Sequence, residues 1–316
     1  MSATLAPTFT ILLALRFIQG LGAAATRVIA VSVIRDRFGG RAMAEIMSLV
    51  FMVFMVVPVI APGIGQVVML FFDWHVIFIF MGLLALLVAI WTAVRLPETL
   101  ALENRRPLTL SSLWTAFSIV MTNRISLFYT LATAVVFGAL FGFINSAQQV
   151  YVGIYDLGVW FPVLFAAVAG MMAVSSFLNS RLVGRFGMRR LSHGALVGFF
   201  LVTSLFFGLS LIGPMRLPLF MLLFTTAMLQ FGWIGSNFNS IAMEPLGHVA
   251  GMASSVQGFI TTVGGAVIGA AIGQAFDGTV TPLAAGFCGV SLIGLILVLI
   301  AERGRLFGSG TTPKAA

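Results

Sequence analysis

Long apolar segments separated by short polar gaps run through the whole chain. Each segment holds about 20 mostly apolar residues, the length that an α-helix needs to cross a hydrocarbon core of about 30 Å. Turn signals rich in Gly, Pro and charged residues separate the segments. The pattern predicts nine membrane-spanning helices, at 9–34, 43–70, 75–95, 126–151, 159–181, 192–213, 217–242, 249–275 and 281–301.

One connector is much longer than the other gaps. Residues 97–125 are polar and basic, with an amphipathic middle. They divide the predicted helices into two groups of unequal size. We expect residues 1–96 to form a partial N-terminal half with three helices, and 126–302 to form a complete six-helix half followed by a short tail at 303–316.

Composition supports an all-α polytopic membrane protein. Sixty per cent of the residues are hydrophobic and only 8% are charged, whereas soluble domains carry about 25% charged residues. The three histidines, His75, His193 and His248, lie at separate span ends and form no ligand cluster. No motif for catalysis, metal binding or cofactor binding is present. We therefore expect no metal, no cofactor and no enzymatic activity.

The distribution of positive charge predicts the topology. Alternate gaps and the tail hold nearly all the cations outside the spans, while the intervening gaps hold only Arg216. Because Lys and Arg concentrate on the cytoplasmic side of membrane proteins, the C-terminus is expected in the cytoplasm. The net charge of +8 is then a topological signal. It is not gathered on a nucleic-acid-binding module, so the bilayer, and not nucleic acid, is the expected partner.

Two arginines interrupt the first apolar segment. Arg16, Gly20, Ala23 and Arg27 follow 4, 3, 4 spacing, which places them on one helix face, and Gln19 borders that face. A charge at the membrane centre costs about 2.5–3.5 kcal/mol on insertion scales, so such residues usually face a protein interior or a water-filled cavity. The alternative is that each arginine extends to the nearer membrane surface.

Further polar residues recur at membrane depth. In 217–242 the residues Gln230, Trp233 and Asn237 form a stripe that continues to Ser240 and Glu244. In 126–151 a polar patch near the outer end is formed by Asn145, Gln148 and Gln149. We interpret Asn145, Gln149, Gln230, Trp233 and Asn237 as lining a substrate cavity. Interhelical hydrogen bonding for the stripe, and a solvated helix end for the patch, are the alternatives.

Several motifs resemble those of the major facilitator superfamily. "RFIQGLGAAA" at 16–25 is similar to the R-x-x-Q-G motif of its fourth helix, and "VVPVIAPGIGQ" at 56–66 to the Gly/Pro antiporter motif of its fifth. "NSRLVGRFGMRRL" at 179–191 resembles the C-terminal copy of its basic loop motif, with Gly184 in place of the usual acidic residue. The Bcr/CflA-type multidrug efflux branch shows the strongest likeness. The motif residues are Pro58, Pro62, Gly63, Gly65 and Gln66 for gating, and Arg185, Gly187, Arg189 and Arg190 for the cytoplasmic loop.

This resemblance implies helices four to twelve of a twelve-helix transporter, lacking the first three. It implies a monomeric exporter in the bacterial inner membrane that exchanges drug-like molecules for protons by alternating access, with Arg16, Gln19 and Arg27 in its proton-coupling polar core. The family's coupling carboxylate would lie on a helix that this chain lacks. Two alternatives stay open, a truncated remnant that does not transport and an exporter of metabolites or amino acids.

Overall fold

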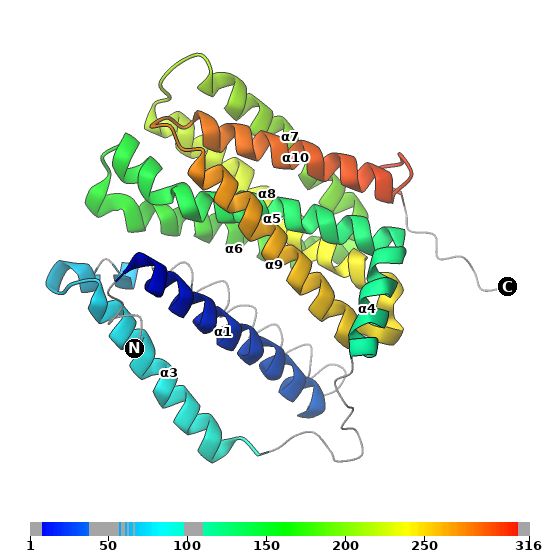
Figure 1. Ribbon diagram of the computed structural model, residues 1–316. Helices are drawn as coiled ribbons and strands as arrows, with labels where there is room; N and C mark the ends of the chain where they lie inside the picture. Colours follow the sequence, from blue (N-terminus) through cyan, green and yellow to red (C-terminus); the bar gives the residue numbers. More distant parts are fainter. Residues whose placement is uncertain are drawn as a thin grey trace. The chain divides into compact units, whose positions relative to one another are not determined.

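The computed structural model describes residues 8–37, 63–65, 67–97 and 110–308, together with 57 and 61. This part of the chain is helical and contains no strand (Figure 1). The chain divides into two compact units, Met1–Pro107 and Leu108–Ala316. The boundary lies inside the predicted connector, and each unit is described below by itself.

Unit 1 contains α1 (Phe9–Arg37) and α3 (His75–Arg95). Helix α3 has the bounds predicted for the third span, and none of its residues is buried within the unit. The first predicted span is observed as α1, which begins at the predicted residue and continues to Arg37. The second predicted span, 43–70, falls mostly outside the described residues.

Unit 2 is a bundle of six long helices. In chain order these are α5 (Arg124–Gln148), α6 (Phe161–Phe186), α7 (Met188–Ser210), α8 (Leu217–Met243), α9 (Ala250–Gln274) and α10 (Thr281–Ala301). Among the described residues, these six and α3 are long and apolar enough to cross a membrane. The prediction of an all-α polytopic membrane protein is therefore confirmed.

Shorter elements complete unit 2. Helix α4 (Leu110–Thr122) lies within the predicted connector and packs against α9. A π-helical segment, η3 (Gln149–Ile154), extends α5, and two 3₁₀ segments, η4 (Gly158–Trp160) and η5 (Glu244–Val249), precede α6 and α9. The polar 97–125 segment therefore contains one helix that belongs to the six-helix bundle.

Local sequence signals account for the helix boundaries. Pro162, Pro218 and Pro282 lie in the first turns of α6, α8 and α10, where the missing N–H of proline costs no hydrogen bond. Asn123 caps α5, because its side chain accepts a hydrogen bond of 3.0 Å from the Ser126 N–H. Gly187 joins α6 to α7 with a φ of 80°, a conformation that side chains with a Cβ rarely adopt.

Phenylalanine rings fill the centre of unit 2. Phe143 of α5, Phe224 of α8 and Phe287 of α10 are buried, with ring centroids 4.7 Å apart for Phe143–Phe224 and 5.5 Å apart for Phe224–Phe287. Phe165 stacks on Phe143 at 5.0 Å and Phe220 on Phe224 at 5.3 Å. Lipid removes most of the hydrophobic driving force between helices, so this dense packing is what holds the bundle together.

Helices α5 and α9 approach each other closely along a row of small residues. Gly265, Gly269 and Gly273 follow one another at intervals of four residues on α9, and this row faces α5. At Gly269 an added Cβ would lie 2.8 Å from the Gly142 backbone nitrogen and would also meet the Phe141 Cβ. Only glycine allows this contact between backbones, so the row serves the packing of α9 against α5.

Candidate functional site

The predicted polar core begins on α1. The Arg16 guanidinium donates a hydrogen bond of 3.0 Å to Gln19 Oε1 and lies 5.0 Å from the centre of the Phe78 ring of α3. A cation over an aromatic face is electrostatically favourable. Both Arg16 and Gln19 are exposed within unit 1, and the Arg27 side chain lies outside the described residues. The assignment of these three residues to a polar interior stays a prediction.

The predicted gating motif is described at only two of its positions. Gly63 and Gly65 are helical, and apart from the local backbone no described atom lies within 4 Å of a Cβ built at either glycine. Pro58, Pro62 and Gln66 lie outside the described residues. The gating role of this segment also stays a prediction.

The seam between α6 and α8 holds two of the predicted cavity residues. Asn237 is 2% exposed and donates 2.7 Å and 2.8 Å hydrogen bonds to Asn179 Oδ1 and the Trp233 carbonyl. The Trp233 indole donates a 2.8 Å bond to the Ser175 carbonyl of α6. The Ser175 hydroxyl donates to the Leu229 carbonyl of α8. Trp233 and Asn237 thus make hydrogen-bonded contacts between α6 and α8. Interhelical hydrogen bonding was the alternative to cavity lining for this polar stripe.

The other predicted cavity residues lie elsewhere in unit 2. Gln230 lies against α7, since a Cβ added to Gly198 would be 3.4 Å from its Nε2 atom. Asn145 is exposed and lies against α9 at Gly273, and Gln149 is exposed where the π-helical segment η3 begins. The five residues therefore belong to different helix seams and ends in unit 2. Their assignment to a substrate cavity stays a prediction.

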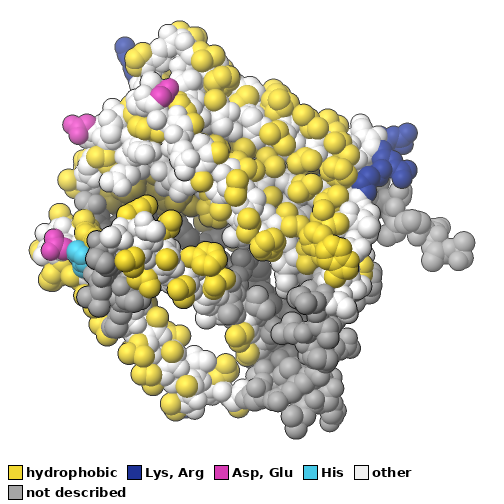
Figure 2. All heavy atoms as spheres, in the orientation of Figure 1, with side chains coloured by type: hydrophobic (Ala, Val, Ile, Leu, Met, Phe, Trp, Pro, Cys, Tyr) yellow, Lys and Arg dark blue, Asp and Glu magenta, His cyan; other side chains and the backbone are white. Residues whose placement is uncertain are grey.

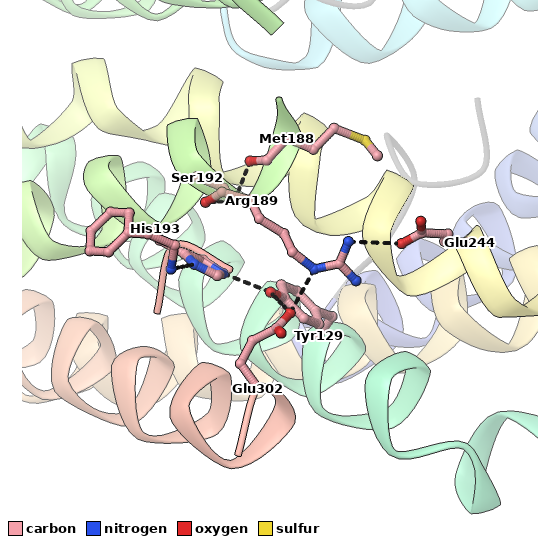
Figure 3. A network of polar contacts seen from close by, with 8 residues as sticks. Tyr129, Met188, Arg189, Ser192, His193, Glu244 and Glu302 are labelled. Atoms are coloured by element: carbon pink, nitrogen blue, oxygen red, sulfur yellow. Dashed lines mark hydrogen bonds and ion pairs between the residues drawn. The ribbon is translucent and has the colours of Figure 1, made fainter. Parts of the chain in front are cut away.

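A cluster of charged and polar side chains joins the ends of four helices (Figure 3). Arg189, at the start of α7, donates from Nε to Glu302 Oε1 at 2.9 Å and pairs through a terminal nitrogen with Glu244 Oε2 at 3.1 Å. Tyr129 of α5 donates to the same Glu302 oxygen at 2.8 Å and lies 2.7 Å from His193 Nε2. Arg189 and Glu302 are each only 14% exposed.

The hydrogen-bond directions in this cluster can be assigned. The Phe307 N–H donates a 3.0 Å bond to His193 Nδ1, so this nitrogen carries no proton. A neutral imidazole then carries its proton on Nε2 and donates it to the Tyr129 oxygen. The Tyr129 hydroxyl donates a hydrogen bond to Glu302 Oε1, which also accepts from Arg189 Nε. A directed hydrogen-bond chain thus runs from the Phe307 N–H through His193 and Tyr129 to Glu302, which also accepts a hydrogen bond from Arg189 at the start of α7.

The sequence indicated this cluster only in part. Arg189 was predicted within the cytoplasmic loop motif, and Glu244 as the end of the polar stripe. Tyr129, His193 and Glu302 were missed, because 64 residues separate Tyr129 from His193 and 173 separate it from Glu302. Their one shared signal is that each lies at a helix end on the side predicted to be basic.

The remaining loop-motif residues border an open cavity of about 390 Å³. Its walls are formed by the end of α6, the start of α7 and the segment after α10, with Arg185, Gly187, Arg189 and Arg190 among the lining residues. A second open cavity, of about 510 Å³, lies near Phe72 and His75 in unit 1. Neither cavity is lined by the five residues predicted for substrate binding.

Comparison with known proteins gives consistent matches along the chain. Residues 1–270 match the family model of the Major Facilitator Superfamily. The chain is 32% identical over 276 residues to a bicyclomycin resistance protein homolog of Haemophilus influenzae, a match covering 85% of this chain and 68% of that protein. It is 29% identical over 276 residues to the uncharacterized MFS-type transporter YdgK of Bacillus subtilis, covering 85% and 67%.

A further relative covers more of the chain. The multidrug resistance protein MdtL of Escherichia coli is 27% identical over 309 residues, which are 96% of this chain and 75% of that protein. The family match, the identities and the apolar helices agree with one another. The chain therefore belongs to the major facilitator superfamily, and it is a multi-pass membrane transporter of small molecules rather than an enzyme.

Proposed function

We propose that this transporter exports drug-like small molecules in exchange for protons. The observation that carries the proposal is that two relatives matching 85% and 96% of the chain bear the names bicyclomycin resistance protein homolog and multidrug resistance protein. Export of amphipathic compounds also fits a chain whose helices are rich in phenylalanine, with 30 Phe in 316 residues.

In this proposal Arg16, Gln19 and Arg27 form the charged part of a polar interior. The Arg16–Gln19 hydrogen bond supports this role, because it holds a guanidinium and an amide together on one helix face. A change in the local charge around Arg16 would favour one conformation over another and so link proton movement to transport. The helix segment that contains Gly63 and Gly65 would act as the gate.

Alternating access would move the six-helix unit as one body. The contacts of Arg189 with Glu244 and Glu302 tie the ends of α7, α8 and α10 together, which supports rigid movement at that end. We assign this end to the cytoplasmic side of a bacterial inner membrane, because cations are concentrated there. The C-terminus is then cytoplasmic, and the protein acts as a monomer.

Transport into everted membrane vesicles tests this function. Vesicles that carry the full chain and acidify their lumen should accumulate ethidium, and a protonophore should abolish the accumulation. Arg16→Ala should remove the proton dependence, and Arg16→Lys should retain part of it. Arg216→Ala, which removes an exposed cation between α7 and α8, should transport like the parent.

Other outcomes identify the alternatives. Vesicles without any accumulation would favour the remnant that does not transport. Competition by small hydrophilic amino acids, with none by bicyclomycin, would favour a metabolite exporter.

A protease site placed at the C-terminus should be protected in intact cells and cleaved in everted vesicles, and the reverse result would overturn the proposed orientation.

A further inference from the structure

The cavity of about 390 Å³ at the junction of α6 and α7 has an unusual chemistry for a helix-bundle surface. Its lining comprises Arg185, Phe186, Gly187, Met188, Arg189, Arg190 and Gly308. Three of these residues are arginines and none is acidic. In the same region, Figure 2 shows basic side chains gathered at the end of unit 2 where α10 ends.

Two of the three arginines carry positive charge that the described residues do not neutralise. Arg189 is paired with Glu244 and Glu302, so its charge is already balanced. Arg185 and Arg190 are both exposed, and no carboxylate of the described part of unit 2 pairs with either. The Arg185 guanidinium lies 5.5 Å from the Phe186 ring centre, which supports the side chain but leaves its N–H donors available.

Backbone geometry adds hydrogen-bond donors to the same cavity. Gly187, with its φ of 80°, ends α6 and allows α7 to begin one residue later. The first N–H groups of a helix have no intrahelical acceptor, and Met188 and Arg190, in the first turn of α7, are among the residues that line the cavity. The partial positive charge of this 23-residue helix adds to that of the side chains. All these donors favour an anion with several oxygen atoms.

The adjoining face of α6 indicates that such an anion would come from the membrane. Val174, Phe177, Arg181 and Arg185 follow 3, 4, 4 spacing, which places them on one helix face, and all four are exposed. Phe177 is 59% exposed, and the Arg181 guanidinium lies 5.3 Å from its ring centre. This face therefore changes from apolar to basic toward the cavity, as expected where acyl chains meet headgroups.

We propose that the cavity between Arg185 and Arg190 binds the phosphate of an anionic phospholipid from the adjacent leaflet. The phosphodiester oxygens accept hydrogen bonds from the two guanidinium groups and from the first turn of α7. The acyl chains pack along Phe177 and Val174. Basic pockets at the cytoplasmic side of membrane helices are suited to such headgroups. This inference goes beyond substrate export, and it does not depend on the substrate.

Native mass spectrometry of the full chain in detergent tests the site, with phosphatidylglycerol and phosphatidylcholine as probes. Phosphatidylglycerol should bind more tightly than phosphatidylcholine. The double variant Arg185→Gln/Arg190→Gln should weaken phosphatidylglycerol binding about 25-fold, since each basic residue near an anionic surface contributes roughly a factor of five. Phosphatidylcholine binding should change little.

The matched control removes the same charge from the same end of the bundle. Arg303 and Arg305 are exposed and do not line the cavity, so Arg303→Gln/Arg305→Gln should bind phosphatidylglycerol nearly as well as the parent. If the first double variant is unstable in detergent, Arg190→Gln against Arg303→Gln gives the same comparison, with about a fivefold loss expected for Arg190→Gln alone.

Three results would overturn the proposal. Equal losses in the two double variants would mean general attraction to a basic surface. Equal binding of the two lipids by the parent would remove the headgroup preference. Displacement of phosphatidylglycerol by inorganic phosphate at comparable concentration would assign the cavity to free phosphate and not to a lipid.

Discussion

Asn237 of α8 and Asn179 of α6 are joined by a buried hydrogen bond of 2.7 Å between their side-chain amides. Asn179 also donates to the Ser236 hydroxyl at 3.1 Å, and Asn237 to the Trp233 carbonyl. Both side chains are almost fully buried, at 6% and 2% exposed. The pair thus connects two helices at the place where the sequence predicts a substrate cavity.

A double-mutant cycle on Asn179 and Asn237 separates these two roles. Alanine at either position removes the bond between the amides, and we expect a coupling energy of about 0.6 kcal/mol, the average for such pairs in membranes. Thermal unfolding in detergent measures this coupling. A purely structural pair should leave substrate affinity intact. Loss of substrate affinity in Asn237→Ala, with no coupling energy between Asn179 and Asn237, would instead support the assignment of Asn237 to the substrate cavity.

Tyr129→Phe should destabilise unit 2 by about 1–3 kcal/mol, because it leaves the His193 N–H without an acceptor in a buried site. Tyr151→Phe provides the matched control. Tyr151 is equally buried, but its hydroxyl has no hydrogen-bond partner within the described part of the chain. Its removal should be neutral or stabilising. Equal shifts in the unfolding temperatures of the two variants would refute the assigned hydrogen-bond chain.

Gly269→Ala should also destabilise the bundle, by about 1–3 kcal/mol, because the added Cβ must push α9 away from the α5 backbone at Gly142. Gly289→Ala is the control, since a Cβ placed there on α10 would meet no described atom within 4 Å beyond the local backbone of the helix itself. Alanine at Gly289 should raise stability slightly through its higher helix propensity. The thermal unfolding midpoints of the two variants should therefore move in opposite directions.

The turn between α9 and α10 gives a prediction about pH. Hydrogen bonds from the Thr279 hydroxyl and N–H, at 2.7 Å and 2.9 Å, hold the pKa of Asp277 below its ordinary value of 3.8. The turn is therefore stabilised above that value, and the effect is lost as the pH falls through the depressed pKa. Titration of the Asp277 carboxyl carbon by NMR measures the midpoint. Thr279→Ala should raise it and Thr279→Ser should not; an unchanged midpoint in Thr279→Ala would contradict the assigned cause.

Hydrophobic length predicted the spans well, because crossing a bilayer is a requirement that each segment meets by itself. The predicted 281–301 and the observed α10 (Thr281–Ala301) have the same bounds, and so do 75–95 and α3. The prediction at 126–151 missed the start of the helix at Arg124 and its π-helical extension to Ile154. Hydropathy does not encode that change of hydrogen-bond pattern.

The polar contacts were predicted less completely, because they depend on how several helices pack together. Periodicity placed Trp233 and Asn237 on one face of their helix, but it could not say that α6 would cover that face. Ser175 and Asn179 are spaced by one helical turn in α6 and carried the complementary signal. The Arg189 cluster unites residues from separate helix ends, and no local spacing connects them.

The bond between Tyr129 and Glu302 also bears on how the protein is made. Tyr129 lies near the start of the first long helix of unit 2, and Glu302 directly follows the last. During synthesis the ribosome produces Tyr129 173 residues before Glu302. The directed hydrogen-bond chain and the Arg189–Glu302 ion pair can therefore form only after all six helices have been translated. Until then Tyr129 and Arg189 lack the carboxylate of Glu302 that both contact in the finished bundle.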